Sequence, residues 1–204
     1  MPIFRAVIML ILFATLKANA QHPADRFRHL LGFTLNQDSL SRVQDRLGPC
    51  NLIETGEGGE YEASFTYLFR NLRTVVSFQS GELGGGKQLL AFEVREATSD
   101  DLTRHCEPQI QLNSRYQLNV ADIGLGLSPD EFAKIIDTTL VWHHDTADVL
   151  IEFRHYLKPS ESKALAEQWG LEEPLAWSDI ALFIQGVFKT QRLIAFSISR
   201  TETY

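Results

Sequence analysis

Residues 124–132 read GLGLSPDEF, and residues 32–40 read GFTLNQDSL. The two stretches align without a gap and share Gly at the first position, Leu at the fourth and Asp at the seventh. A repeat architecture duplicates a whole supersecondary unit, so the match is informative only if the sequence that follows is repeated as well. The sequence downstream of each copy therefore decides whether the match is a repeat.

Each copy predicts the start of an amphipathic helix. In the second copy Ser128 is the expected N-cap, Pro129 takes the first helical position, and Glu131 closes a capping box. In the first copy Asn36 is the expected cap and the box is incomplete. Gly48 and Pro49 mark the expected end of the first helix.

Three stretches rich in β-branched and aromatic residues then follow each helix start, which indicates strands. They lie at residues 61–69, 72–80 and 88–96 in the first half, and at 149–157, 179–188 and 192–200 in the second. This order predicts an α+β fold of two tandem units, each a short helical segment packed on an antiparallel β-sheet. We expect the units to span residues 21–110 and 111–204.

Two stretches stand outside this pattern. SRYQLNV at residues 114–120 is expected to add a connecting strand near the boundary between the units. KPSESKALAEQWGLEEP at residues 158–174 separates two strands of the second unit and is expected to hold a short helix around Glu161–Trp169.

The first twenty residues have the order of an export signal peptide. Arg5 precedes an apolar run at residues 6–16, and Ala18 and Ala20 form an A-x-A cleavage site. The run is shorter than the roughly 20 apolar residues of a membrane-spanning helix. The cleavage point also lacks the Cys that lipid attachment requires. We expect residues 1–20 to be removed, leaving a periplasmic or secreted protein without stable membrane insertion.

The chain is acidic, with a net charge of −7 that becomes about −9 once Arg5 and Lys17 leave with the signal. An acidic chain without a basic run is a poor ligand for nucleic acid or anionic membranes. We therefore expect no nucleic-acid partner. A protein or small molecule is the expected partner, and no cofactor is expected.

Cys50 and Cys106 are the only cysteines. An even pair in an exported chain is most simply a structural disulfide. The alternative, a catalytic or metal-binding thiol, is disfavoured because oxidising compartments cap free thiols.

GELGGGKQ at residues 81–88 partly matches a phosphate-binding P-loop. Gln88 stands where Ser or Thr would hold Mg²⁺, and the sequence continues as a strand instead of the helix that such a loop requires. We interpret the stretch as a hairpin loop.

Other catalytic motifs are weak. His143 and His144, with Asp145 next to them and His155 further on, lack a spacing that aims two imidazoles at one metal ion, so they are interpreted as loop residues. No G-x-S-x-G motif occurs. The acidic pairs at residues 100–101 and 172–173 are interpreted as solvated turns, although a sugar hydrolase could use any two carboxylates that the fold brings together.

Strand alternation predicts a different kind of site. The apolar residues expected to face the helices are Phe78, Phe92, Val94, Phe153, Leu182, Ile184, Phe196 and Ile198. The opposite sheet surface then carries Gln79, Gln185 and the predicted binding residues Arg73, Glu93, Arg95, Glu152, Arg154, Tyr156 and Phe183. Arginine and aromatic residues are enriched at protein interfaces. The alternative is an ordinary solvated sheet face with paired charges.

GFTLNQDSLSRVQDRLGPC and GLGLSPDEFAKIID, each followed by strands, resemble the β-lactamase inhibitor protein family. The same unit occurs singly in the SmpA/OmlA-like outer-membrane lipoproteins. The resemblance implies two tandem units and a protein that acts by binding an envelope or secreted protein, including by inhibition. The alternatives are a structural or assembly factor of the bacterial cell envelope and, third, a hydrolase.

Overall fold

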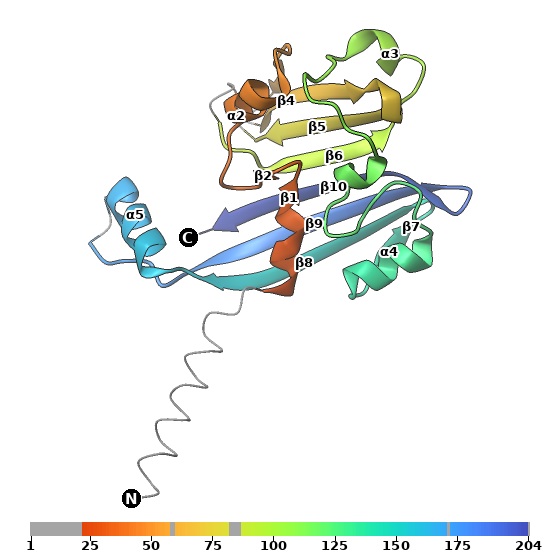
Figure 1. Ribbon diagram of the computed structural model, residues 1–204. Helices are drawn as coiled ribbons and strands as arrows, with labels where there is room; N and C mark the ends of the chain where they lie inside the picture. Colours follow the sequence, from red (N-terminus) through yellow and green to blue (C-terminus); the bar gives the residue numbers. More distant parts are fainter. Residues whose placement is uncertain (1–21, 58–59, 82–86, 171, 204) are drawn as a thin grey trace, which may run out of the picture. The chain divides into compact units, whose positions relative to one another are not determined.

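The computed structural model describes residues 22–57, 60–81, 87–170 and 172–203 (Figure 1). The predicted signal peptide, and residues 82–86 of the predicted hairpin loop, lie outside the described part of the chain. Within that part, no helix has the length and apolar character needed to cross a membrane.

The protein combines helices with antiparallel sheet, as predicted. A two-stranded sheet pairs β1 (His29–Leu30) with β2 (Phe33–Thr34). Among the described residues, the main sheet has eight strands in the order β3-β4-β5-β6-β10-β9-β8-β7 (Figure 1). These strands are β3 (Ile53–Glu57), β4 (Glu60–Phe69), β5 (Thr74–Ser80), β6 (Ala91–Glu96), β7 (Val141–His143), β8 (Thr146–Tyr156), β9 (Trp177–Lys189) and β10 (Arg192–Thr203).

Four short α-helices and three 3₁₀ helices connect the strands in the described chain. The α-helices are α2 (Leu40–Leu47), α3 (Asp101–Arg104), α4 (Pro129–Ile136) and α5 (Pro159–Trp169). The 3₁₀ helices are η1 (Pro23–Arg28), η2 (Arg70–Leu72) and η3 (Arg115–Leu118). The helix predicted around residues 161–169 is confirmed by α5. The strand predicted at residues 114–120 is wrong, because the Ser114 side chain caps η3 in a capping box with Gln117.

The two helix starts differ in how well the sequence predicted them. At α4 the Ser128 hydroxyl accepts from the Glu131 N–H, and the Glu131 carboxylate accepts from the Ser128 N–H at 2.8 Å, so the predicted capping box is confirmed. At α2 the N-cap is Ser39, whose hydroxyl accepts from the Arg42 N–H. The prediction of Asn36 as cap was wrong, because Asn36 has a positive φ of 61° in the turn before the helix.

The glycines that open the two similar stretches are required for different reasons. Gly32 has a φ of +78°, a conformation that favours glycine. Gly124 has no such φ; a Cβ there would collide with the side-chain amide of Asn119. The same sequence position therefore serves a left-handed turn in the first copy and a close side-chain approach in the second.

By its internal contacts the chain divides into two compact units. The small unit contains the described residues up to Asp25, residues 152–180 and residues 202–203; the large unit contains residues 26–151 and 181–201. Strands β8, β9 and β10 pass from one unit into the other. This division is different from the predicted repeat boundary near residue 110, which stays a prediction.

The core of the large unit lies on one face of the sheet. Strand registers align two buried rows across β4, β5, β6 and β10: Tyr67–Val76–Val94–Phe196 and Phe65–Phe78–Phe92–Ile198. Helix α2 packs against β4 and β5 and buries Leu40, Val43 and Leu47. The predicted inward direction of the apolar residues of β5, β6, β9 and β10 is thereby confirmed.

Helix α4 packs against β9 in the same unit. The Phe132 and Phe188 rings meet edge to face with centroids 5.6 Å apart. Gly186 leaves the space that Phe132 fills, since a Cβ at Gly186 would lie 2.9 Å from Phe132 Cζ. The absence of a side chain at Gly186 therefore allows the helix to approach the strand closely.

The predicted disulfide between Cys50 and Cys106 is confirmed, with a Cα–Cα distance of 5.6 Å. It joins the segment after α2 to the segment after α3, beside β4, where the Leu68 N–H donates to the Cys106 carbonyl at 2.7 Å. Closing a loop with a sequence separation of 56 contributes about 4 kcal/mol in the chain-entropy model. The bond holds the edge of β4 where β3 no longer covers it.

Candidate binding surface on the open face of the sheet

The side of the sheet opposite the core is called the open face here. Because side chains alternate along a strand, the residues between the two buried rows point to this face. In the large unit they form the rows Ser64–Gln79–Ala91–Ser199, Thr66–Ser77–Glu93–Ser197 and Leu68–Val75–Arg95–Ala195. The members on β4 and β5 are buried, except for Gln79, whereas those on β6 and β10 are partly exposed. Gln79, Glu93 and Arg95 therefore lie on the face that the sequence predicted.

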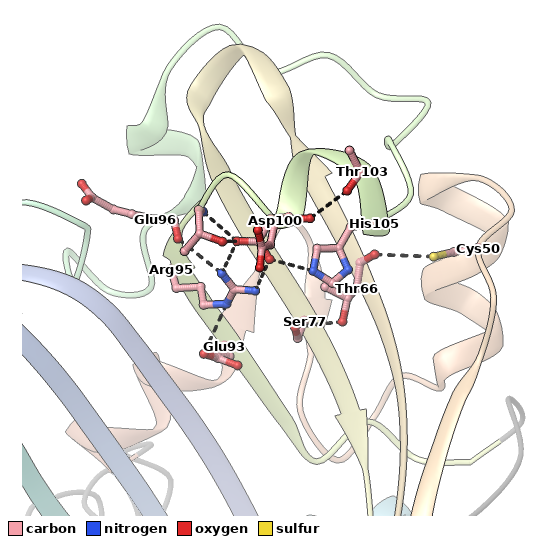
Figure 2. Close-up of polar contacts among 11 residues, drawn as sticks. Cys50, Thr66, Ser77, Glu93, Arg95, Glu96, Asp100, Thr103 and His105 are labelled. Atoms are coloured by element: carbon pink, nitrogen blue, oxygen red, sulfur yellow. Dashed lines mark hydrogen bonds and ion pairs between the residues drawn. The ribbon is translucent and has the colours of Figure 1, made fainter.

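Arg95 on β6 is held by the buried carboxylate of Asp101 on α3, and dashed lines in Figure 2 mark the contacts around Arg95 and His105. Its two terminal nitrogens donate to the two oxygens of Asp101 at 2.7 Å each. Asp101 also accepts from the Thr98 N–H and hydroxyl at 2.7 Å, and from His105 Nε2 at 2.9 Å. Only 7% of the Asp101 side chain is exposed. The interpretation of residues 100–101 as a solvated turn was wrong for Asp101.

This cluster shifts the pKa values of Asp101 and Arg95 in opposite directions. The hydrogen bonds from Arg95 hold the pKa of Asp101 far below its usual range, with further lowering by Thr98 and His105 and an opposing effect of burial. The Asp101 carboxylate raises the pKa of Arg95. Both Asp101 oxygens are occupied, so the carboxylate is not free to act as a general base. Its geometry is that of an anchor that fastens α3 to the open face.

Glu93 lies beside this cluster with fewer partners. Its Oε1 is 3.9 Å from Arg95 Nε, and 35% of its side chain is exposed. Burial raises the pKa of Glu93, and the nearby carboxylates of Glu62 and Asp101 add to the effect, whereas Arg95 opposes it. In the same row the Thr66 and Ser77 hydroxyls hydrogen-bond at 3.0 Å. Glu93 is thus a partly desolvated acceptor that a bound cationic or hydrogen-bond donor group would stabilise.

Arg73 lies outside β5, which corrects the prediction that residues 72–80 form one strand. It precedes β5 and adopts a left-handed conformation with φ 49° at the end of η2. Its N–H donates to the Arg70 carbonyl at 3.1 Å. The tight connection between β4 and β5 takes Arg73 out of the strand, so its side chain does not follow the strand alternation.

Strand β9 displays Phe183 and Gln185 on the open face of the large unit, as predicted. Phe183 is 38% exposed. The Gln185 side chain donates to Asp148 on β8 at 3.0 Å. Leu150 on β8 is 57% exposed and was missed, although it stands two residues before the predicted Glu152 in the same alternation.

The small unit brings an arginine and two aromatic residues together on the ends of β8 and β9. The Arg154 guanidinium lies 4.8 Å from the centroid of the Trp177 ring, and its Nε donates to Asp179 at 3.2 Å. Tyr156 is 63% exposed and Trp177 46% exposed. Glu152, also predicted, is exposed on β8. We name Arg154, Tyr156, Trp177 and Asp179 the Arg154 patch.

Trp177 was missed as a site residue because the predicted strand began only at residue 179; Asp179 lay within that predicted strand but was not among the predicted binding residues. Ser178 made the start of the strand hard to recognise, because it is a polar residue at a buried position of β9. Its hydroxyl is satisfied by Glu202 of β10 at 2.5 Å. In the structure, exposed and buried residues alternate from Trp177 to Ile180, so this segment belongs to β9.

The histidines predicted as loop residues do not form a cluster in the described structure. His143 ends β7 and His144 follows in the turn, both exposed. His155 lies on β8, with its Nε2 4.0 Å from a Glu161 oxygen. In the described ranges no three His, Cys, Asp or Glu side chains are grouped so that they could hold a metal ion.

Comparison with models of known protein families, with curated proteins and with solved structures found no match.

Proposed function

We propose that the chain is an exported, non-catalytic module that binds another protein through the open face of its sheet. The observation that carries the proposal is the Arg154 patch: an arginine held between Trp177 and Asp179, with the exposed Tyr156 on the same strand as Arg154. Trp, Tyr and Arg are the residues that contribute most often to the binding energy of protein interfaces.

The physical arrangement of the patch favours binding. Arg154 is oriented before a partner arrives, because the Trp177 ring and the Asp179 carboxylate restrict its rotamers. Side chains that are ordered in the free protein lose less conformational entropy on association. Their position on paired strands also keeps the backbone rigid.

We also propose that the chain consists of two tandem units and is related to the β-lactamase inhibitor protein family. The element order supports two units, because α2 is followed by β3 to β6, and α4 by β7 to β10. The sheet order is symmetric, since each set of four strands forms a meander and the sets meet at β6 and β10. Export is proposed from the signal-like residues 1–20, and the Cys50–Cys106 disulfide supports it.

The test is a pull-down with residues 21–204 from the envelope and culture fluid of the source organism. The bait is compared with the triple variant Arg154→Ala, Tyr156→Ala, Trp177→Ala. Lys163→Ala, on α5 of the same small unit, is the matched control, because its side chain is 78% exposed and lies outside the patch. Circular dichroism melting curves of all baits exclude unfolding as the cause of a loss.

A partner that is captured by the wild type and by Lys163→Ala, and lost with the triple variant, supports binding through the patch. A stable membrane-associated complex that the triple variant retains would contradict it. That second result would favour the alternative function, a structural or assembly factor of the cell envelope, with its interface elsewhere.

A further inference from the structure

Strand β8 has a long outer edge that no described strand covers. It runs from Thr146 to Tyr156, but in the register of the described chain β7 pairs only with its first three residues, Thr146 to Asp148. An uncovered strand edge presents a row of backbone donors and acceptors that another strand can pair with. Neither proline nor lysine, which commonly block such edges, occurs between Glu152 and Tyr156.

The backbone direction along β8 follows from its bonds to β9. The Leu157 N–H donates to the Ala176 carbonyl at 3.1 Å, and the Phe188 N–H donates to the Asp145 carbonyl at 2.7 Å. In an antiparallel ladder, alternate residues bond to the same neighbour. Odd-numbered residues of β8 therefore bond to β9, and the N–H and C=O groups of Glu152, Arg154 and Tyr156 point outward.

We propose that two copies of this chain form a homodimer by antiparallel pairing of their β8 edges about a two-fold axis at Phe153. In this register Glu152 lies opposite Arg154 of the second copy, and Arg154 lies opposite Glu152 of the second copy. Each such pair exchanges two backbone hydrogen bonds, because both of its residues point their backbone groups outward. The same surface on both copies forms the interface, as a two-fold dimer requires.

The charges select this register over its neighbours. An axis at Glu152 would place two carboxylates opposite each other, and an axis at Arg154 would place two guanidinium groups opposite each other. Like charges directly opposite across a ladder are destabilising, whereas opposite charges are stabilising. Glu152 is exposed and the Arg154 side chain is 50% exposed, so both are accessible to a second copy. The charge pattern of the edge is therefore self-complementary, and a second copy of the chain fits it.

The homodimer and the proposed binding function both involve Arg154, but they are tested by different measurements. Pairing at the edge extends the sheet, and it leaves the Arg154 side chain on the open face of each copy. The oligomeric state of the isolated chain tests it without any other protein, so failure of the dimer and failure of partner binding are separate results.

The test is sedimentation equilibrium on residues 21–204, with Glu152→Arg, Arg154→Glu and the double charge swap. We expect a dimer in the wild type. Each single reversal should raise the dimer dissociation constant by at least about tenfold, because two stabilising pairs become two repulsive ones. The double swap should restore dimerisation. Glu172→Arg, at an exposed loop position, is the control and should leave the constant unchanged. A monomer at all concentrations, or a dimer indifferent to the single reversals, would overturn the proposal.

A second measurement tests the register. Facing residues of a non-hydrogen-bonded antiparallel pair have Cα atoms about 4.5 Å apart, within disulfide range. Phe153→Cys should therefore form a covalent dimer on mild oxidation, whereas Lys163→Cys on α5 should not. If the native disulfide is intact and Phe153→Cys fails to cross-link while the wild type dimerises, the axis does not pass through residue 153.

Discussion

Arg95 and Asp101 are joined by two parallel hydrogen bonds of 2.7 Å, and this pair fastens helix α3 to strand β6 (Figure 2). The two residues lie six positions apart and belong to different elements. The carboxylate is buried and the guanidinium is partly exposed. Loss of the carboxylate would leave Arg95 without its main partner, so the pair should matter more for stability than an exposed ion pair.

The first prediction concerns Asp101. Asp101→Ala removes the acceptor of five hydrogen bonds, and we expect it to lower the free energy of unfolding by about 2–4 kcal/mol. Urea denaturation at pH 7 measures the change. The matched control is Asp100→Ala at the preceding, exposed position, whose side chain makes no capping bond and whose loss should cost less than about 0.5 kcal/mol. Equal effects of the two changes would show that the buried pair is not an anchor.

The second prediction concerns the pH dependence of this anchor. The folded-state pKa of Asp101 is lowered, so its contribution is fully present above the unfolded pKa of about 3.9 and is lost as the pH falls toward the folded value. The difference in unfolding free energy between the wild type and Asp101→Asn should therefore shrink between about pH 6 and about pH 3. Urea titrations across this range measure it; a difference that grows on acidification would contradict the assignment.

The third prediction concerns Glu93, whose charge should destabilise the folded state, whereas that of Asp101 stabilises it. Burial raises the pKa of Glu93, so its charged form disfavours the folded state when the pH lies above the folded pKa. Glu93→Gln should raise the urea midpoint at pH 7, and this gain should vanish below the unfolded pKa of about 4.3, where the acid is neutral in both states. Glu172→Gln in an exposed loop should have no comparable effect. Destabilisation by Glu93→Gln at pH 7 would show that the Arg95 contact outweighs the burial of Glu93.

The fourth prediction concerns the contact between α4 and β9. Gly186→Ala places a Cβ 2.9 Å from Phe132 Cζ and 3.0 Å from Leu193 Cδ1, which should cost about 1–3 kcal/mol. Phe132→Leu removes the outer ring atoms and should make the alanine less costly. The double-mutant cycle measures this coupling by urea unfolding. Additive effects of the two changes would argue against close packing at this position.

The sequence predicted those parts of the fold that depend on local signals. The capping box at Ser128, the helix end at Gly48 and most strands follow from short-range chemistry. The pairing of Arg95 with Asp101 was missed, because an acidic pair in a turn does not reveal which strand it reaches in three dimensions. Trp177 was missed because Ser178 interrupts the apolar alternation and finds its hydrogen-bond partner only in β10. Arg73 was misplaced because a left-handed turn removes it from the strand.

The open-face account depends most directly on the amount of partner that the triple variant of Arg154, Tyr156 and Trp177 retains, relative to the wild type and to Lys163→Ala. Loss of a central interface residue typically costs about 2 kcal/mol or more, so the combined change should reduce recovery by at least about thirtyfold. Quantitative mass spectrometry of the three eluates gives this ratio. Recovery reduced by that factor, with a melting temperature equal to that of the control, is the expected result. A partner recovered equally by all three baits would contradict the account.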